Sequence, residues 1–168
     1  MTAAAWANQD EVVKRLQERF GQSVSSEQGG NGMGIVAAMA ALHDVLHFLK
    51  TTEDLSFTML TDLFPVDYGD RSPRFEIVYL LNSMKLKSRL VVKVRLGEGE
   101  RVPTLSDVWA AAEWLEREAY DMFGIAFEGH PDPRRILMTE GFDGYPLRKD
   151  FPLEGHDFEQ PFKVTLEE

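Results

Sequence analysis

Two histidines one helical turn apart are the first candidates for chemistry in this sequence. His43 and His47 stand in the stretch HDVLH, and side chains at positions i and i+4 of a helix can bind one zinc ion together. The stretch resembles the zinc motif HExxH, with Asp44 in place of the longer glutamate. No third ligand follows at a familiar spacing, and histidines are common at the border of an apolar helix face. A metallohydrolase is therefore kept only as an alternative.

A second candidate combines Glu118, Asp121 and His130, which could act as acid, base and orienting group. No serine or cysteine nucleophile stands nearby, and the spacing is not that of metal ligands. Several basic residues accompany these acids instead: Arg117, Arg134, Arg135, Arg148 and Lys149. We therefore expect buried or interfacial ion pairs rather than catalysis. They include an Arg117–Asp121 pair at i,i+4 and a carboxylate partner for at least one of Arg134 and Arg135.

Four glycines lie close together in the N-terminal part of the chain, Gly29, Gly30, Gly32 and Gly34. In the dinucleotide-binding pattern GxGxxG a third glycine would stand where Ile35 is found, and no Lys-Ser/Thr pair follows as in a P-loop. No convincing strand precedes the glycines. The sequence therefore predicts a flexible loop here rather than a phosphate-binding site.

The composition of the whole chain limits the possible functions. The 168 residues carry a net charge of −10 and include no cysteine. An acidic chain does not favour nucleic acid or an anionic membrane surface, and a chain without cysteine cannot supply the usual thiolate ligands of an iron–sulfur cluster. No apolar run approaches the roughly 20 residues that span a bilayer, and the N-terminus lacks a signal-peptide pattern. We expect a cytoplasmic protein that reaches a membrane only through partners.

Two helices are predicted in the first third of the chain. One follows a capping-box-like pair, Asn8 and Glu11, and ends at Gly21. The other spans about residues 37–50, and its apolar positions recur at helical spacing: Leu42, Val45, Leu46 and Leu49. Both helices are amphipathic and should cover a core.

A third helix is predicted between Thr104, with Asp107 as its capping partner, and Gly124. Its apolar residues share one face: Val108, Ala111, Ala112, Leu115, Ala119 and Met122. Trp114 lies on the opposite face, where a purely solvated surface needs no tryptophan. We expect Trp114 to be half-buried within the domain or to contact a partner protein.

Alternating apolar residues predict two strands over residues 75–81 and 90–96, joined by a hairpin. Another strand is predicted over residues 57–63, with Phe57, Met59 and Leu63 on one side, before a turn-rich loop over 65–73. Both main strands are apolar at alternate positions, which favours a sheet packed under helices. The predicted fold is α+β, a mixed β-sheet covered by amphipathic helices.

The C-terminal part of the chain has a different character from the rest. His130-Pro131 and Asp132-Pro133 favour extended backbone, and beyond residue 144 prolines and aromatic residues occur without helical or strand periodicity. We therefore predict a compact domain over residues 1–125 and an extended strap and arm over 126–168. Such an arm cannot bury itself well within its own domain, yet its large apolar groups are costly to leave in water, so we expect it to pack on a partner.

The most specific pattern in the chain is ERE-x2-D-MF-x6-H-x3-R-x-IL, from Glu116 to Leu137, followed by PLRKDFP from Pro146 to Pro152. The two blocks, in this order, resemble the C subunit of the proton-pumping NADH:quinone oxidoreductase, respiratory complex I. Pro133, Glu113 and Phe151 depart from the usual family residues, and Pro133 removes one backbone donor. The resemblance marks these motif and interface positions: Trp114, Glu116, Arg117, Glu118, Asp121, Gly124, His130, Arg134, Arg135, Pro146, Arg148, Lys149, Asp150 and Phe151.

The resemblance implies a cofactor-free subunit of the hydrophilic arm with no catalytic residues of its own. It would lie on the cytoplasmic side of the membrane and pack against the quinone-site subunit, which resembles a hydrogenase large subunit. Flavin, iron–sulfur clusters and quinone would belong to neighbouring subunits, which pass electrons from NADH to quinone and couple this to proton translocation. An equivalent subunit of a ferredoxin-dependent or F420H2-dependent complex, or of a membrane-bound hydrogenase, is the alternative that the resemblance leaves open.

Overall fold

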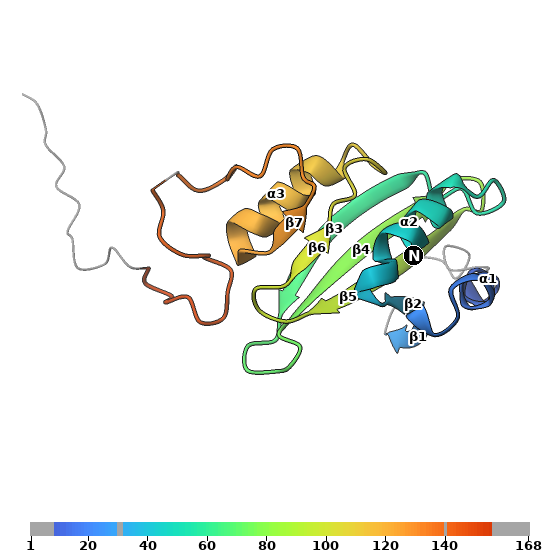
Figure 1. Cartoon of the computed structure of the whole chain (residues 1–168), viewed down its shortest axis with the longest axis horizontal. Coiled ribbons are helices and arrows are strands. Elements are labelled where there is room, and N and C mark those ends of the chain that lie inside the picture. Colours follow the sequence, from blue (N-terminus) through green and yellow to red (C-terminus); the bar gives the residue numbers. More distant parts are fainter. Residues whose placement is uncertain (1–8, 30–31, 140, 156–168) are drawn as a thin grey trace, which may run out of the picture.

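A five-stranded mixed β-sheet forms the centre of the molecule (Figure 1). The computed structural model describes residues 9–29, 32–139 and 141–155. The order across the sheet is β1-β2-β5-β4-β3, and all neighbours are antiparallel except β2 and β5. The strands are β1 (Val24–Gly29), β2 (Gly32–Ala37), β3 (Met59–Asp67), β4 (Phe75–Ser83) and β5 (Ser88–Leu96). The predicted α+β class with a mixed sheet is confirmed.

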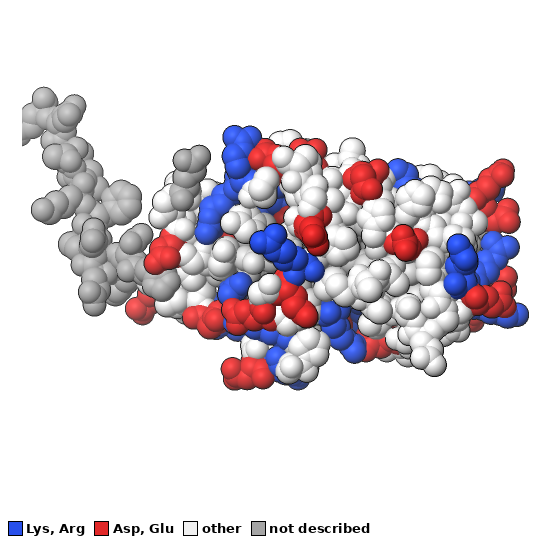
Figure 2. Space-filling view, viewed as in Figure 1, with Lys and Arg blue, Asp and Glu red and all other residues white. Residues whose placement is uncertain are grey.

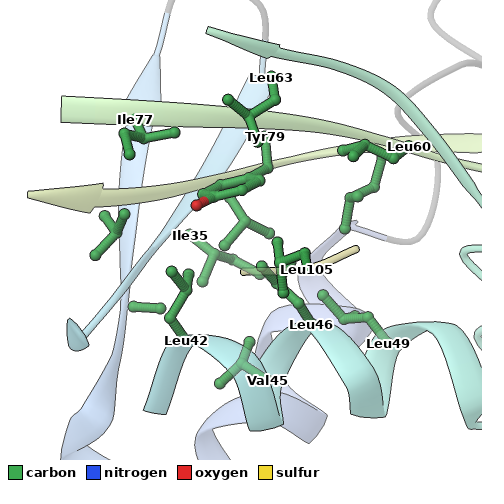
Figure 3. Packing of buried hydrophobic residues seen from close by; sticks show 14 of the residues in the cluster. Ile35, Leu42, Val45, Leu46, Leu49, Leu60, Leu63, Ile77, Tyr79 and Leu105 are labelled. Carbon is green, nitrogen blue, oxygen red and sulfur yellow. The ribbon is translucent and has the colours of Figure 1, made fainter. Parts of the chain in front are cut away.

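Two helices near the N-terminus pack on one face of this sheet, α1 (Gln9–Phe20) and α2 (Leu42–Thr51). A short 3-10 turn follows α1 at Gly21–Ser23, and another precedes α2 at Met39–Ala41. The four apolar residues predicted for α2 are all buried, and Figure 3 shows Leu42, Leu46 and Leu49 on the side of the helix that faces Ile35 and Tyr79 of the sheet. The predicted capping residue Asn8 lies outside the described residues.

The two faces of the sheet differ in character because side chains alternate along each strand. In β4 and β5 one set of alternate residues joins the core beneath the helices, from Phe75 to Leu81 and from Leu90 to Leu96. The other set includes charged residues that pair across strands on the face turned away from this core: Arg95 donates to Glu76 at 3.0 Å, and Lys93 contacts both Glu76 and Glu27. The helices therefore cover only one face of the sheet.

Three of the four clustered glycines, Gly29, Gly32 and Gly34, lie in strands rather than in the predicted flexible loop, and Gly30 lies outside the described residues. Residues 24–29 and 32–37 form the antiparallel pair β1 and β2, and β2 also pairs in parallel with β5. The sequence does not predict these strands because they lack regular apolar alternation, whereas their backbone hydrogen bonds are made with each other and with β5.

The third predicted strand exists but is longer than expected. β3 continues through Pro65 and Val66 to Asp67, so the predicted loop begins later than residue 65. A bulge between Leu60 and Asp62 shifts the alternation. Met59 is therefore exposed and Leu60 is buried, which corrects the face predicted for Met59.

The third helix, α3 (Ala112–Phe123), packs against β3 and begins later than predicted. Residues 105–111 form turns instead, in which Leu105, Val108 and Trp109 are buried. Thr104 does not cap the helix, which begins only at Ala112; its hydroxyl group donates to the Glu116 carboxylate at 2.5 Å and accepts the N–H of Ser106 at 3.2 Å. The predicted C-terminal end is confirmed, since Gly124 has a φ of 73°.

The strap after α3 begins with a strand of its own. β7 (Ala126–Glu128) pairs in parallel with β6 (Arg101–Pro103), which precedes the turns before α3. The start of the predicted strap therefore belongs to the folded part of the molecule. From β7 the chain runs along α3 and then away from it (Figure 1).

Candidate functional site

The carboxylate of Asp121 organises the contact between α3 and the strap. It is fully buried, and its Oδ2 accepts backbone N–H bonds from Ile136, Leu137 and Met138 at 2.7–3.0 Å. Its Oδ1 accepts a bond from Arg135 at 2.8 Å. Burial alone would raise the pKa of Asp121, but these backbone bonds and Arg135 outweigh it and hold the pKa below its ordinary value. Asp121 thus fixes a turn of the strap as an ionised group.

Arg117 makes a second set of bonds to the strap, and the predicted Arg117–Asp121 pair is wrong. Its Nε donates to the carbonyl oxygen of Arg134 at 2.9 Å, and its Nη2 donates to that of Arg135 at 3.2 Å. Its ion pair is with Asp132, at 3.4 Å. The guanidinium group also lies 5.2 Å from the ring centre of Trp114. Asp121 is unavailable to Arg117 because it is occupied by Arg135 and the backbone.

Arg134 and Arg135 both meet carboxylates, as expected for at least one of them. Arg134 donates two bonds to Asp132, at 2.7 and 2.8 Å, and holds the pKa of Asp132 at about 2. Arg135 is mostly buried and is bonded to Asp121 and to the carbonyl oxygen of Gly144. The exposed Arg134 pair should contribute little to stability, whereas the Arg135 pair is shielded from water.

Glu116 is the other fully buried acid of the motif. It accepts bonds from the Thr104 hydroxyl group and from the Leu105 N–H, which joins α3 to the turns before it. Burial raises the pKa of Glu116 to about 6, although both bonds act in the opposite direction. The acid therefore titrates close to neutral pH.

His130 lies next to Glu116, with Nε2 at 3.9 Å from a carboxylate oxygen. The N–H of Asp132 donates to His130 Nδ1 at 3.0 Å, so Nδ1 carries a lone pair. The ring proton then belongs on Nε2, which lies 2.9 Å from the carbonyl oxygen of Glu113 and donates to it. His130 thus connects the strap to α3 through both ring nitrogens.

Gly124 permits close contact between the end of α3 and the second motif block. Its left-handed φ favours glycine, and a Cβ atom there would lie 2.5 Å from Tyr145 and 2.7 Å from Arg148. Arg148 also donates to the carbonyl oxygen of Phe123 and pairs with Glu98 at 2.8 Å. No side chain larger than hydrogen fits at position 124 without moving this contact.

The segment over residues 145–151 packs on its own domain, although we expected that it could not bury itself well there. The backbone N–H of Lys149 donates to Asp67 at 2.9 Å, and Asp150 pairs with Arg74 at 2.8 Å. Arg74 also binds Asp67 through two bonds, and these donors hold the pKa of Asp67 far below its ordinary value although burial opposes them. The segment is therefore anchored at the end of β3.

Comparison with known proteins adds to this geometry. The family model described as "Respiratory-chain NADH dehydrogenase, 30 Kd subunit" matches residues 35–157. The chain belongs to this family. It is 50% identical over 140 residues to the NADH-quinone oxidoreductase C 2 subunit of Rhizobium meliloti (strain 1021), an alignment that covers 82% of this chain and 76% of the relative.

Two solved structures resemble the fold of this chain. A trypsin-resistant fragment (1-134) of Nqo5 is 35% identical, with a TM-score of 0.60, and the match covers 71% of this chain and 96% of the fragment. A chain of the membrane-bound sulfane sulfur reductase, an archaeal respiratory membrane complex, is 25% identical, with a TM-score of 0.71 and 95% of both chains covered. The expected relationship to complex I is confirmed, and the chain is a subunit of an oxidoreductase complex.

The motif residues of the 30 kDa family divide into two groups in this structure. Most of them make internal contacts that hold the strap and the segment over residues 145–151, which includes Pro146 and Phe151; the Phe151 ring stacks on Phe142 at 5.8 Å. Trp114 and Glu118 are exposed on α3, and Trp114 keeps 60% of its surface accessible. Glu118 is therefore exposed, whereas Asp121 and His130 are bonded within the contact between α3 and the strap.

Among the described residues, no third ligand completes a metal site with His43 and His47. The ring of His43 contacts Asp107 at 2.9 Å and stacks on that of His47, with centroids 6.2 Å apart. In the part of the chain that the structure describes, no three His, Cys, Asp or Glu side chains gather closely enough to hold a metal ion. None of the described helices has both the length and the apolar character needed to cross a bilayer.

Sequence reasoning missed the partners of the motif residues. Asp67, Arg74 and Glu98 bind the segment over 145–151 although Asp67 lies 82 residues from Lys149 in the chain. Thr104 stands out in the sequence as a helix cap, whereas its hydroxyl group is bonded to Glu116. No local pattern marks these pairings, because each of them arises from the tertiary fold.

Proposed function

We propose that this chain is a cofactor-free scaffold of NADH:quinone oxidoreductase that packs against the quinone-site subunit. The observation that carries the proposal is the bonding of Asp121, whose carboxylate oxygens accept hydrogen bonds from three backbone N–H groups and from Arg135. An acid bonded in this way has no capacity left for proton transfer or metal binding. Its bonds instead hold a surface strap in one shape, which is what an interface with another protein requires.

The chemistry of the assembled complex also supports a scaffold. Electron transfer between protein-bound centres and a closed quinone pocket both need fixed geometry, which a rigid neighbour can provide without reacting groups. The chain has no cysteine, so the clusters of the complex would be bound by other subunits. Flavin and quinone would likewise be held by other subunits. We place the chain at the cytoplasmic side of the membrane, attached through these neighbours.

The experiment is co-expression of the tagged full-length chain with the quinone-site subunit from the same source. We expect the two subunits to purify together, and the chain alone to contain no stoichiometric metal or flavin and to oxidise no NADH. Absence of the quinone-site subunit from the purified sample would contradict the proposed partner. Stoichiometric metal that is lost in His43→Ala would contradict the cofactor-free role.

A related complex with another electron donor is the second candidate. The likeness to the archaeal sulfane sulfur reductase chain, over 95% of both chains, favours a scaffold that different respiratory complexes share. The relatives at higher identity carry the name NADH-quinone oxidoreductase, which favours NADH. Assaying the purified complex with NADH, reduced ferredoxin and F420H2 distinguishes these donors.

A further inference from the structure

A groove with an unusual concentration of arginine lies between α3 and the strap. Two adjoining cavities of about 330 and 430 Å³ share Arg117, Tyr120 and Pro133 in their walls. The larger cavity is completed by Arg134 and Arg135, and no carboxylate is among the described residues that line it. We call these five lining residues the arginine groove. Figure 2 shows basic side chains over α3 and the strap, on a chain whose net charge is −10.

The arginines of this groove are held in place by the fold. Arg117 is fixed by two strap carbonyl groups, and Arg135 is fixed by Asp121 and the Gly144 carbonyl group. Among the described residues, Asp132 is the carboxylate at ion-pair distance from Arg117, at 3.4 Å, and it is shared with Arg134; Glu116 and Glu128 also line the smaller cavity. The charge of Arg117 is therefore only partly matched there. A groove of this kind attracts an anion and loses little side-chain freedom on binding it.

Apolar surface beside the groove indicates what carries the anion. Trp114 is 60% exposed, and its ring lies against the guanidinium group of Arg117. Tyr120 and Pro133 continue this surface into the groove. Tryptophan, tyrosine and arginine are the residues that most often dominate binding at protein interfaces. A free inorganic anion would leave this apolar surface in water, whereas a protein would cover it.

We propose that the arginine groove binds an aspartate or glutamate side chain of the quinone-site subunit while Trp114 packs against apolar surface beside that acid. The inference rests on the proposed function and adds the chemistry by which the partner is recognised. A carboxylate matches the planar fork of a guanidinium group, and burial of the pair beneath Trp114 strengthens its hydrogen bonds.

Co-purification of full-length variants with the quinone-site subunit tests the importance of the groove. Trp114→Ala and Arg134→Glu change side chains that are 60% and 77% exposed, so both variants should fold like the parent. We expect each to lower recovery of the complex by at least about tenfold. The matched controls are Met84→Ala, which is 73% exposed, and Arg89→Glu, which is exposed on β5; both should leave recovery unchanged.

The outcomes separate this inference from the proposed function. If the parent chain and both controls fail to bring down the quinone-site subunit, the proposed function is contradicted and this inference with it. If the parent binds and the groove variants bind equally well, only the groove is excluded. Circular dichroism and urea unfolding of each variant verify that any loss of binding is not a loss of folding.

The identity of the bound acid is tested by a chemical cross-link. Arg134→Lys keeps the charge and introduces an amine, which a carbodiimide joins to a carboxylate in direct contact with it. We expect an amide bond to an aspartate or glutamate of the quinone-site subunit, located by mass spectrometry. Cross-links confined to Asp132 or to the acids of this chain's own residues 156–168, or no cross-link at all, would overturn the proposal.

Discussion

At the scale of single residues, Asp121 is the side chain on which the strap depends most. Asp121→Asn removes the charge that Arg135 needs and replaces one accepting oxygen by an NH2 group, leaving buried donors unsatisfied. Removing one partner of a buried pair typically costs about 3–5 kcal/mol, and we expect a loss of this size in the free energy of unfolding. Urea unfolding measures it. Glu118→Gln, an exposed change on the same helix, is the control and should stay within about 0.5 kcal/mol of the parent.

Glu116 should make stability depend on pH near neutrality. Its pKa rises from 4.5 to about 6 on folding, so the folded state binds the proton more tightly than the unfolded state. The resulting stabilisation is complete below about pH 4.5 and is lost as the pH rises through 6, by about 2 kcal/mol in all. Glu116→Gln removes this dependence while keeping an oxygen for the Leu105 N–H.

The pH dependence is measured as the difference in unfolding free energy between parent and Glu116→Gln from pH 4 to 7.5. We expect the difference to shift in favour of the variant as the pH rises from 4.5 to 6. The carboxylates of Asp67, Asp121 and Asp150 act oppositely, because their lowered pKa values stabilise the protein above about pH 4 in both chains. Parallel curves for the two chains would show that Glu116 does not titrate in this range.

The types of these residues could be predicted from the sequence, but several of their partners could not. Arginines after two prolines indicated carboxylate partners, and both Arg134 and Arg135 have one. The helical spacing of Arg117 and Asp121 suggested a pair that does not form. Three backbone N–H groups of the strap and Arg135 compete successfully for Asp121, and those groups approach it only when the chain folds back.

At the scale of elements, Gly124 connects the end of α3 to the segment over residues 145–151. Gly124→Ala should destabilise the fold, because alanine disfavours the left-handed backbone and its Cβ atom would clash with Tyr145 and Arg148. Gly99→Ala is the matched control, since Gly99 has a φ of 79° but nothing within 4 Å of its Cβ position. The left-handed backbone alone should lower the free energy of unfolding of both variants by about 1–2 kcal/mol.

The difference in unfolding free energy between these two glycine variants measures the cost of the clash with Tyr145 and Arg148. We expect Gly124→Ala to be destabilised further and to be cleaved faster by trypsin after Arg148 and Lys149, because the segment can no longer lie against α3. Urea unfolding and limited proteolysis provide the two readouts. Equal behaviour of the two variants would mean that Tyr145 and Arg148 move aside without cost.

Elements with a regular pattern were predictable, and those stabilised by distant pairing were not. The buried residues of α2 and the alternation in β4 and β5 follow directly from their apolar periods. The strands β1 and β2 have no such period and owe their position to β5. The start of α3 differs from the predicted one because residues 105–111 form turns that bury Leu105, Val108 and Trp109, contacts that the local pattern does not show.

At the scale of the whole molecule, the segment over residues 145–151 should stabilise the domain on which it lies. A chain that ends after Phe142 loses the bonds of Lys149 and Asp150 to Asp67 and Arg74, whereas a chain that ends after Gly155 keeps them. We expect the free energy of unfolding of the shorter chain to be about 1–3 kcal/mol lower than that of the parent. The longer chain should have the same free energy of unfolding as the parent. Identical urea midpoints for all three chains would show that the docked segment adds no stability.

The central claim, that this chain supports the complex without reacting groups of its own, is tested by turnover per assembled complex. Cells lacking the chain are complemented with the parent, Trp114→Ala, Asp121→Asn, Glu118→Gln or His43→Ala, and NADH:quinone turnover is divided by the amount of complex on a native gel. We predict that this ratio stays constant, because a scaffold variant changes how much complex assembles and not how each complex works. A variant that assembles to the parental level and loses turnover would contradict the account.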